Sequence, residues 1–322
     1  MQYKKMGRTG LKISEITLGT MIFGQQVDEV EANTIIDLAI EKGINSFDTA
    51  DGYADGRSEE IVGKSLKNKR HSVVLASKVA SKQGLGLNDS GLSREHIFQA
   101  VEHSLRRLGT DYLDIYYAHH PDSTTPIEET LRAFDSLVQQ GKVRYIACSN
   151  YRAGQLVRAL AVSEQRNLAR FDCVQTVYNL ITRDVETELL PTCTDEGVGV
   201  VVYNPLAGGL LTGKHNATEP PPSDTRFGQN PIYFERYWSP VNFTAVEHIK
   251  KITEAYDRKP AQFALAWVLG NPKIASAIVG ASSAKQLAEN LGALDVKLSH
   301  EETKACDDIW LELRPPRFFY GR

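Results

Sequence analysis

Cysteine is scarce in this sequence, and the spacings that would make it structural are missing. The 322 residues include four cysteines, which lie far apart with no C-x-x-C pair and no His/Cys spacing of a zinc site. These absences argue against a disulfide framework and a zinc knuckle. We expect reduced thiols and a cytoplasmic protein.

Long apolar runs and charge of one sign are also absent. No apolar run reaches the roughly 20 residues of a membrane-spanning helix, and the first residues, MQYKKMGRTG, lack the apolar stretch of a signal peptide. The 37 basic and 40 acidic residues are interspersed and leave a net charge of −3. We therefore expect no membrane and no nucleic acid as partner, and no sequence pattern indicates an oligomeric state.

What the sequence has is a regular alternation of strand and helix patterns. Hydrophobic residues make up 42% of the chain, enough for a large core. Short runs rich in β-branched residues recur between segments of helical periodicity. The predicted strands are residues 15–19, 44–48, 73–78, 114–119, 143–149, 172–179, 198–204 and 274–280.

The segments between the strands carry helix start and stop signals. Residues 28–43 begin with an Asp at the cap position, and residues 93–109 begin Ser-Arg-Glu and end Arg-Arg-Leu-Gly. Helices are likewise predicted at 58–67 and 127–142. Eight strand and helix units in one chain favour a parallel (β/α)8 TIM barrel over a doubly wound open sheet, which usually has fewer strands.

Two segments lie outside the repeating units. Residues 3–7 and 11–14 flank the turn GRTG and predict an N-terminal β-hairpin that could close the bottom of the barrel. Residues 205–240, after the seventh predicted strand, are dense in Gly, Pro, Asn and Ser and are too long for an ordinary connection, which predicts a long functional loop. No linker is visible, so we expect a single domain over residues 1–322.

Polar residues gather at the carboxyl ends of the predicted strands, where barrel enzymes build their sites. Tyr53 lies in the loop after the second strand, within reach of the same end. The residues at the strand ends are Asp48, Lys78, His119, Ser149, Asn150, Gln175, Tyr203 and Asn204.

This set supports proton transfer to or from an oxygen atom. A tyrosine is a poor acid at neutral pH, but an adjacent ammonium such as that of Lys78 favours the phenolate and lowers the pKa. Asp48 could hold the lysine, and His119 could hydrogen-bond a substrate oxygen. Each residue alone also fits a structural role as a surface tyrosine, an ion pair or a loop histidine. Their occurrence at consecutive strand ends favours a site.

The order of several motifs resembles the aldo-keto reductases, nicotinamide-dependent (β/α)8 barrels that reduce aldehydes and ketones. The similar segments are GRTGLKISEITLGTMIFG, FDTADGYADGRSEE, ASK at 76–78, LDIYYAHHPD, KVRYIACSNY, VQTVYN, YNPLAGGLLTGK and IVGASSAKQLAENLGA. The segment KHNATEPPPSDTRFG resembles the branch of aflatoxin-aldehyde reductases and potassium-channel β-subunits.

The resemblance implies a catalytic set of Asp48, Tyr53, Lys78 and His119. Tyr53 would be the general acid, Lys78 would lower its pKa, Asp48 would pair with the lysine, and His119 rather than His120 would orient the substrate carbonyl. The substrate would be a small aldehyde or ketone, and no metal would be needed.

The resemblance also implies a nicotinamide cofactor bound at the barrel mouth, since no G-x-G-x-x-G motif joins a strand to a helix. NADPH is expected, with NADH as the other possibility. Many family members carry a basic residue where the 2′-phosphate binds, whereas Gly280, Ser282 and Gln286 occupy the corresponding positions here and Lys285 is expected to point outward. Lys214 and Arg226 could supply that charge or could be solvated. The implied cofactor residues are Thr20, Met21, Asp48, Ser149, Asn150, Gln175, Tyr203, Asn204, Pro205, Leu206, Gly208, Leu211, Lys214, Arg226, Gly280, Ser282, Gln286, Glu289 and Asn290.

Two other functions fit the same sequence features. A cofactor-binding partner subunit with little turnover would have the same fold and residues. A hydrolase on the same barrel would need a His/Asp metal cluster or two facing carboxylates, and Asp48 is the one clear carboxylate at a strand end.

Overall fold

Strands and helices alternate along the chain as the sequence predicts. The computed structural model describes residues 1–223 and 225–314. Each predicted barrel strand is present, with ends within two residues of the expected ones. The barrel strands are β3 (Ile16–Gly19), β4 (Ser46–Asp48), β5 (Val74–Val79), β6 (Leu113–Ala118), β7 (Val143–Ser149), β8 (Phe171–Val177), β9 (Gly199–Tyr203) and β10 (Ser276–Gly280).

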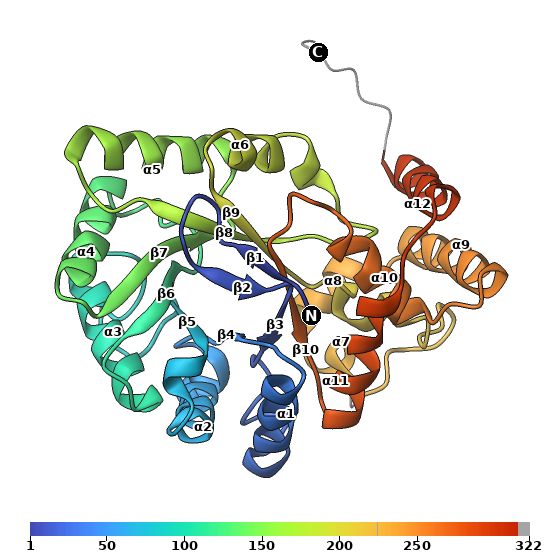
Figure 1. Cartoon of the computed structure of the whole chain (residues 1–322), viewed down its shortest axis with the longest axis horizontal. Helices are drawn as coiled ribbons and strands as arrows, with labels where there is room; N and C mark the ends of the chain where they lie inside the picture. The colour runs from blue at the N-terminus through green and yellow to red at the C-terminus, as the bar shows by residue number, and fades with distance from the viewer. Residues whose placement is uncertain (224, 315–322) are drawn as a thin grey trace. The chain divides into compact units, whose positions relative to one another are not determined.

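These strands close into a barrel in the order β10-β3-β4-β5-β6-β7-β8-β9. The ladders from β9 through β10 and β3 to β8 are parallel, and Figure 1 shows helices around the outside of the ring. The predicted (β/α)8 barrel is confirmed. All of the strands therefore end at one face, where their last side chains can meet.

The first helices begin and end at the predicted signals. Asp28 accepts a hydrogen bond from the Glu31 N–H at the start of the first helix, and Ser93 accepts one from His96 N–H. The helix that Ser93 caps ends at Gly109, which has the left-handed conformation with a φ of 60°. The helices are α1 (Glu29–Glu41), α2 (Arg57–Leu66), α3 (Arg94–Leu108), α4 (Ile127–Gln139), α5 (Ala153–Arg166), α6 (Leu189–Asp195) and α11 (Ala284–Leu291). Short 3-10 turns are η1 (Tyr53–Gly56), η2 (Arg70–Ser72) and η3 (Asp184–Glu186).

The predicted N-terminal hairpin is present. Strands β1 (Tyr3–Lys5) and β2 (Lys12–Ser14) pair antiparallel, with Lys4 opposite Ile13. Met6 and Ile13 are buried in one hydrophobic cluster with residues from β5, β6, β7, β8, β9 and β10. The hairpin thus covers the end of the barrel from which β3 starts, and the opposite end is left for the site (Figure 1).

The contacts of the chain fall into two compact units. The first comprises Met1–Thr176, Val185–Tyr203 and Pro272–Ala288 and holds the hairpin and the barrel strands, with β8 ending one residue beyond it. The second comprises Val177–Asp184, Asn204–Asn271 and the chain from Glu289 on. Its elements are η4 (Ala207–Thr212), α7 (Arg226–Gln229), α8 (Pro231–Tyr237), α9 (Pro240–Ala255), α10 (Pro260–Leu269), η5 (Gly292–Asp295) and α12 (His300–Leu313). A single domain over the whole chain stays a prediction.

The long segment after β9 is more ordered than a loop. It contains η4, α7 and α8. Thr225 caps the start of α7, and Asn230 caps the start of α8, whose first residue is Pro231. Asp224, inside the predicted loop, lies outside the described residues. None of the helices in residues 1–223 and 225–314 has the length and apolar character needed to cross a membrane.

Candidate active site

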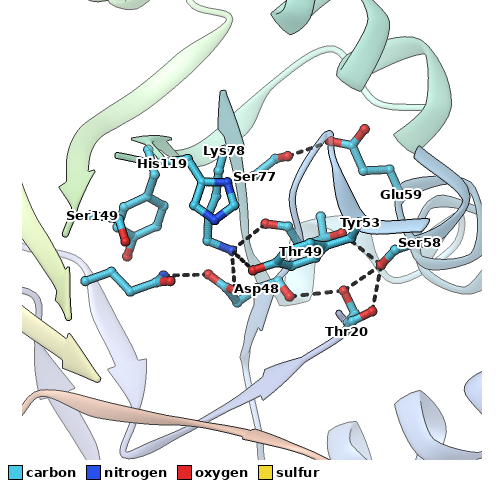
Figure 2. A network of polar contacts seen from close by, with 12 residues as sticks. Thr20, Asp48, Thr49, Tyr53, Ser58, Glu59, Ser77, Lys78, His119 and Ser149 are labelled. Carbon is cyan, nitrogen blue, oxygen red and sulfur yellow. Dashed lines mark hydrogen bonds and ion pairs between the residues drawn. The ribbon is translucent and has the colours of Figure 1, made fainter. Parts of the chain in front are cut away.

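Three of the predicted side chains come from the carboxyl ends of consecutive strands. Asp48 ends β4, Lys78 is next to last in β5, and His119 follows β6 directly. In the parallel ladders Asp48 lies opposite Ala76, and Lys78 lies opposite Tyr117. This register brings the three functional groups to the same face of the barrel (Figure 2).

Tyr53 reaches this face from a tight turn. Its N–H donates to the Ala50 carbonyl (3.2 Å), and the next two residues, Ala54 and Asp55, have φ values of 50° and 52°. Two successive non-glycine residues in the left-handed region cost on the order of 1 kcal/mol each. Such strain persists only where the surroundings impose it.

Lys78 is the centre of the site. Its side chain is fully buried, and its Nζ donates to Asp48 Oδ1 (2.5 Å), to the Thr49 carbonyl (2.8 Å) and to Tyr53 OH (2.9 Å). An ammonium has three donors, and all three are used. Burial alone would lower the pKa of Lys78, but the charge of Asp48 and the bonds to Asp48 and Tyr53 outweigh it and raise the pKa. The lysine is therefore a buried, fully hydrogen-bonded cation.

Asp48 is held on both sides of its carboxylate. Its Oδ2 accepts from Gln175 Nε2 (2.8 Å) of β8, opposite the oxygen that meets Lys78. Thr20 fixes the backbone, since its N–H and its Oγ1 both donate to the Asp48 carbonyl at 3.0 Å. Met21, half-buried, follows Thr20 in the same turn. Gln175 and Thr20, both predicted as cofactor residues, thus belong to the network around Asp48 in the protein itself.

His119 stands beside the phenol. The rings of His119 and Tyr53 lie edge to face, with centroids 5.9 Å apart. Burial first, and then the charges of Lys78 and His120, lower the pKa of His119 to about 3. Its Nδ1 is buried and has no hydrogen-bond partner among the described residues. A neutral imidazole at this position can donate an N–H to a carbonyl oxygen at neutral pH.

Four of the predicted cofactor residues lie together near the ends of β7, β8 and β9, namely Ser149, Asn150, Gln175 and Tyr203. Asn150 has a φ of 63°, which asparagine tolerates, and its Nδ2 donates to Ser149 Oγ (3.1 Å) and to the His119 carbonyl (2.9 Å). Tyr203 OH donates to Asn150 Oδ1 (2.7 Å), and Asn150 N–H donates to the Gln175 carbonyl (3.0 Å). These contacts orient a group of amide and hydroxyl side chains next to His119.

A second layer of buried polar residues supports the site, and sequence reasoning did not find it. Glu59 of α2 accepts from Ser77 Oγ (2.5 Å) and from Arg107 Nε of α3 (2.7 Å). Ser58 contacts the Oγ1 atoms of Thr20 (2.9 Å) and Thr49 (3.0 Å) (Figure 2). The only available signal was the acidic first turn of this helix, which reads as an ordinary helix start.

The first turn of α11 is occupied by the chain's own side chains. Ser282 N–H donates to Gln286 Oε1 (2.7 Å), and Ala284 N–H donates to Glu31 Oε1 of α1 (2.7 Å). Gly280, the last residue of β10, is exposed. A phosphate at this turn would compete with a carboxylate that lies more than 250 positions earlier in the sequence. That separation is why the contact of Glu31 was not predicted.

The remaining predicted cofactor residues belong to the second unit and have contacts within it. Asn204 has a φ of 55°, and its carbonyl accepts from Asn179 Nδ2 (3.0 Å). Arg226 lies over the ring of Tyr233, 5.0 Å from its centroid, and Lys214 is exposed. Pro205 and Leu206 precede η4, Gly208 and Leu211 lie within it, and Glu289 and Asn290 lie on α11. As cofactor residues they stay predictions.

The arrangement as a whole is suited to moving a proton. A phenol contacts a buried cation, the cation is neutralised by one carboxylate, and a neutral imidazole lies beside them. Within residues 1–223 and 225–314, no three His, Cys, Asp or Glu side chains gather as a metal site would require. Fold and site together define a (β/α)8-barrel protein with an enzyme-like polar centre at the carboxyl ends of its strands.

Comparison with known proteins identifies the family of the chain. The profile of the aldo/keto reductase family matches residues 15–311, so the chain belongs to the aldo/keto reductase family. Membership of this family implies NAD(P)-dependent oxidoreduction of small carbonyl compounds.

Individual relatives match along nearly their whole length. A probable voltage-gated potassium channel subunit beta of Arabidopsis thaliana is 39% identical over 308 residues, which cover 92% of each chain. An uncharacterised oxidoreductase of Bacillus subtilis is 38% identical over 321 residues, or 96% of each chain. A putative voltage-gated potassium channel subunit beta of Schizosaccharomyces pombe is 37% identical over 331 residues, covering 99% of this chain and 96% of that protein.

Proposed function

We propose that this protein reduces an aldehyde or ketone to an alcohol with NADPH, and that Tyr53 is the general acid. The observation that supports this most directly is the hydrogen bond between Lys78 Nζ and Tyr53 OH at 2.9 Å. The same Nζ also donates to the carboxylate of Asp48, which holds the lysine in place. An ammonium at this distance favours the phenolate, so the phenol releases its proton more readily than a tyrosine in water.

A bound nicotinamide would supply the hydride for the carbonyl carbon, and negative charge would then develop on the carbonyl oxygen. Tyr53 donates its proton to that oxygen as the charge appears, and Lys78 stabilises the phenolate left behind. His119, neutral because its pKa is lowered to about 3, donates an N–H to the same oxygen and orients it. Solvent returns a proton to Tyr53, so one carbonyl group, one hydride and one proton give one alcohol.

The residues near His119 fit a nicotinamide. A carboxamide offers N–H donors and a carbonyl acceptor, and Ser149, Asn150 and Gln175 present amide and hydroxyl groups at the ends of β7 and β8. Tyr203, held against Asn150, would offer its ring to the nicotinamide. For the phosphates we propose the residues of η4 and the first turn of α11, with the preference for NADPH depending on Lys214 and Arg226.

A partner subunit is the second candidate function. Two relatives that cover more than nine tenths of this chain are described as probable or putative potassium channel β-subunits. A chain in that role would bind the cofactor and would turn over slowly. Since Tyr53, Lys78 and His119 are all in place, we propose turnover as the main function.

The test is a turnover assay with separate cofactor titrations. The purified protein is titrated with NADPH and with NADH by fluorescence quenching, and then mixed with each cofactor and 4-nitrobenzaldehyde. We expect NADPH to bind and to be oxidised only when the aldehyde is present. Tight binding without turnover on a panel of aldehydes and ketones would favour the partner subunit, and absence of binding by both cofactors would overturn the proposal.

A further inference from the structure

Asp51 is a buried acid that the proposed chemistry does not use. It lies between β4 and Tyr53, and its side chain is fully buried. Neither carboxyl oxygen has a hydrogen-bond partner among the described residues. An ionised carboxylate without partners is very costly in a protein interior. Burial without hydrogen-bond partners therefore favours the neutral form of the Asp51 carboxyl group.

The neighbours of Asp51 do not compensate a negative charge. Glu59 of α2 repels it, and Arg107 of α3 and Lys78 of β5 attract it less strongly than burial and Glu59 oppose it. Tyr116 of β6 faces the same group, with a buried hydroxyl that also has no partner among the described residues. Burial and the charge of Glu59 raise the pKa of Asp51 from 3.8 to about 8.

The two acids of this cluster differ in their partners. Glu59 accepts hydrogen bonds on both oxygens, from Ser77 and Arg107, and can carry the charge. The charge of Asp51 is stabilised only in part, by the Gly52 N–H, which lies close without forming a hydrogen bond of normal geometry, and by Arg107 and Lys78. Both oxygens of Glu59 are thus hydrogen-bonded, whereas neither oxygen of Asp51 is.

Asp51 is tied to the reacting groups through the backbone. Its N–H donates to the carbonyl of Lys78 (3.3 Å), and two residues later Tyr53 begins the turn η1. An ionised Asp51 would place a second negative charge behind Lys78, where it would compete with Asp48 and Tyr53 for the ammonium. It would also draw the Ala50–Tyr53 segment toward water.

We propose that Asp51 is a positioning residue of the site, which keeps Lys78 and Tyr53 in contact only while its carboxyl group is protonated. This inference rests on the proposed function, because it acts through the proposed general acid. It implies that reduction is lost at alkaline pH when Asp51 ionises.

The test compares Asp51→Asn with Asp55→Asn, a matched control in the same turn whose side chain is exposed. The pH profile of kcat/KM is measured with NADPH and 4-nitrobenzaldehyde. We expect wild type and Asp55→Asn to lose activity above about pH 8, where Asp51 ionises. Asp51→Asn should retain its activity at pH 7 within about threefold and should lose the alkaline limb or shift it upward by about one pH unit. A profile of Asp51→Asn that superimposes on wild type, or an equal loss at every pH in a folded protein, would overturn the inference.

A stability measurement tests the protonation of Asp51 without catalysis. Because the folded pKa lies above the unfolded one, the folded protein holds a proton that the unfolded chain has lost. The stability of wild type relative to Asp51→Asn should therefore fall as pH rises from about 4 to about 8 and should be flat above that. Urea unfolding of both proteins at several pH values measures the difference, and a constant difference would contradict the inference.

A third measurement uses wild type alone, and it tests the inference even if the Asp51→Asn chain fails to fold. In wild type labelled with ¹³C at the Asp side-chain carboxyls, the Asp51 signal should titrate near pH 8, and titration below pH 5 would overturn the inference. If wild type turns over no carbonyl compound, the proposed function fails, and the stability and ¹³C results still decide whether Asp51 is protonated.

Discussion

At the scale of single residues, the contact between Glu31 and the first turn of α11 bears on the choice between NADPH and NADH. The carboxylate accepts from Ala284 N–H, one of the groups that would otherwise attract a phosphate. It also brings a negative charge to a turn where Ser282 and Gln286 bond to each other. For a 2′-phosphate bound at this turn, as proposed, the negative charge of Glu31 would weaken the binding of NADPH relative to NADH.

Replacing Glu31 by Gln should raise the affinity for NADPH relative to NADH by roughly 5-fold. Removing one charge about 4 Å from a phosphate in water is worth about 1 kcal/mol, and glutamine keeps an oxygen for Ala284 N–H. Dissociation constants of both cofactors are measured by fluorescence quenching for wild type and variant.

Glu29→Gln is the matched control for this prediction. It removes the same charge from the same helix, where Glu29 pairs with Arg57 and Lys64 at the surface. Its ratio of NADPH to NADH affinity should stay at the wild-type value. Equal ratios in Glu31→Gln and wild type would show that the carboxylate does not meet the 2′-phosphate.

At the scale of elements, the hairpin and the site occupy opposite ends of the barrel. Met6 and Ile13 fill the end from which the strands start, whereas Asp48 and Lys78 lie at the ends where the strands finish. Stability at the hairpin and activity at the site should therefore respond to different substitutions.

Ile13→Ala should lower the free energy of unfolding by about 2 to 5 kcal/mol, because it removes a side chain that is 1% exposed within the core cluster. Lys12→Ala, at the exposed neighbouring position of β2, should change it by about 0.5 kcal/mol or less. Urea unfolding measures both, and kcat with NADPH should stay within about twofold of wild type. Equal stabilities of the two variants would contradict the role of the hairpin.

At the scale of the whole molecule, the barrel was predictable because its strands alternate regularly with helices whose caps are encoded locally. The meeting of Asp48, Lys78 and His119 followed from that fold, since parallel strands end at one face. The roles of Glu59 and Glu31 were not predictable, because their partners come from elements whose packing no local pattern encodes. The division into two units likewise depends on contacts between distant segments.

The most direct test of the proposed chemistry is the rate of hydride transfer in Tyr53→Phe. With NADPH bound first and 4-nitrobenzaldehyde in excess, the rate of a single turnover is compared between wild type, Tyr53→Phe and Tyr3→Phe, a control that removes a phenol from the hairpin. Loss of a general acid typically lowers the rate by about 10² to 10⁴. We predict a loss of at least about 10² in Tyr53→Phe, with NADPH affinity within about threefold of wild type and no loss in Tyr3→Phe. A Tyr53→Phe rate within threefold of wild type would contradict the assignment of Tyr53 as general acid.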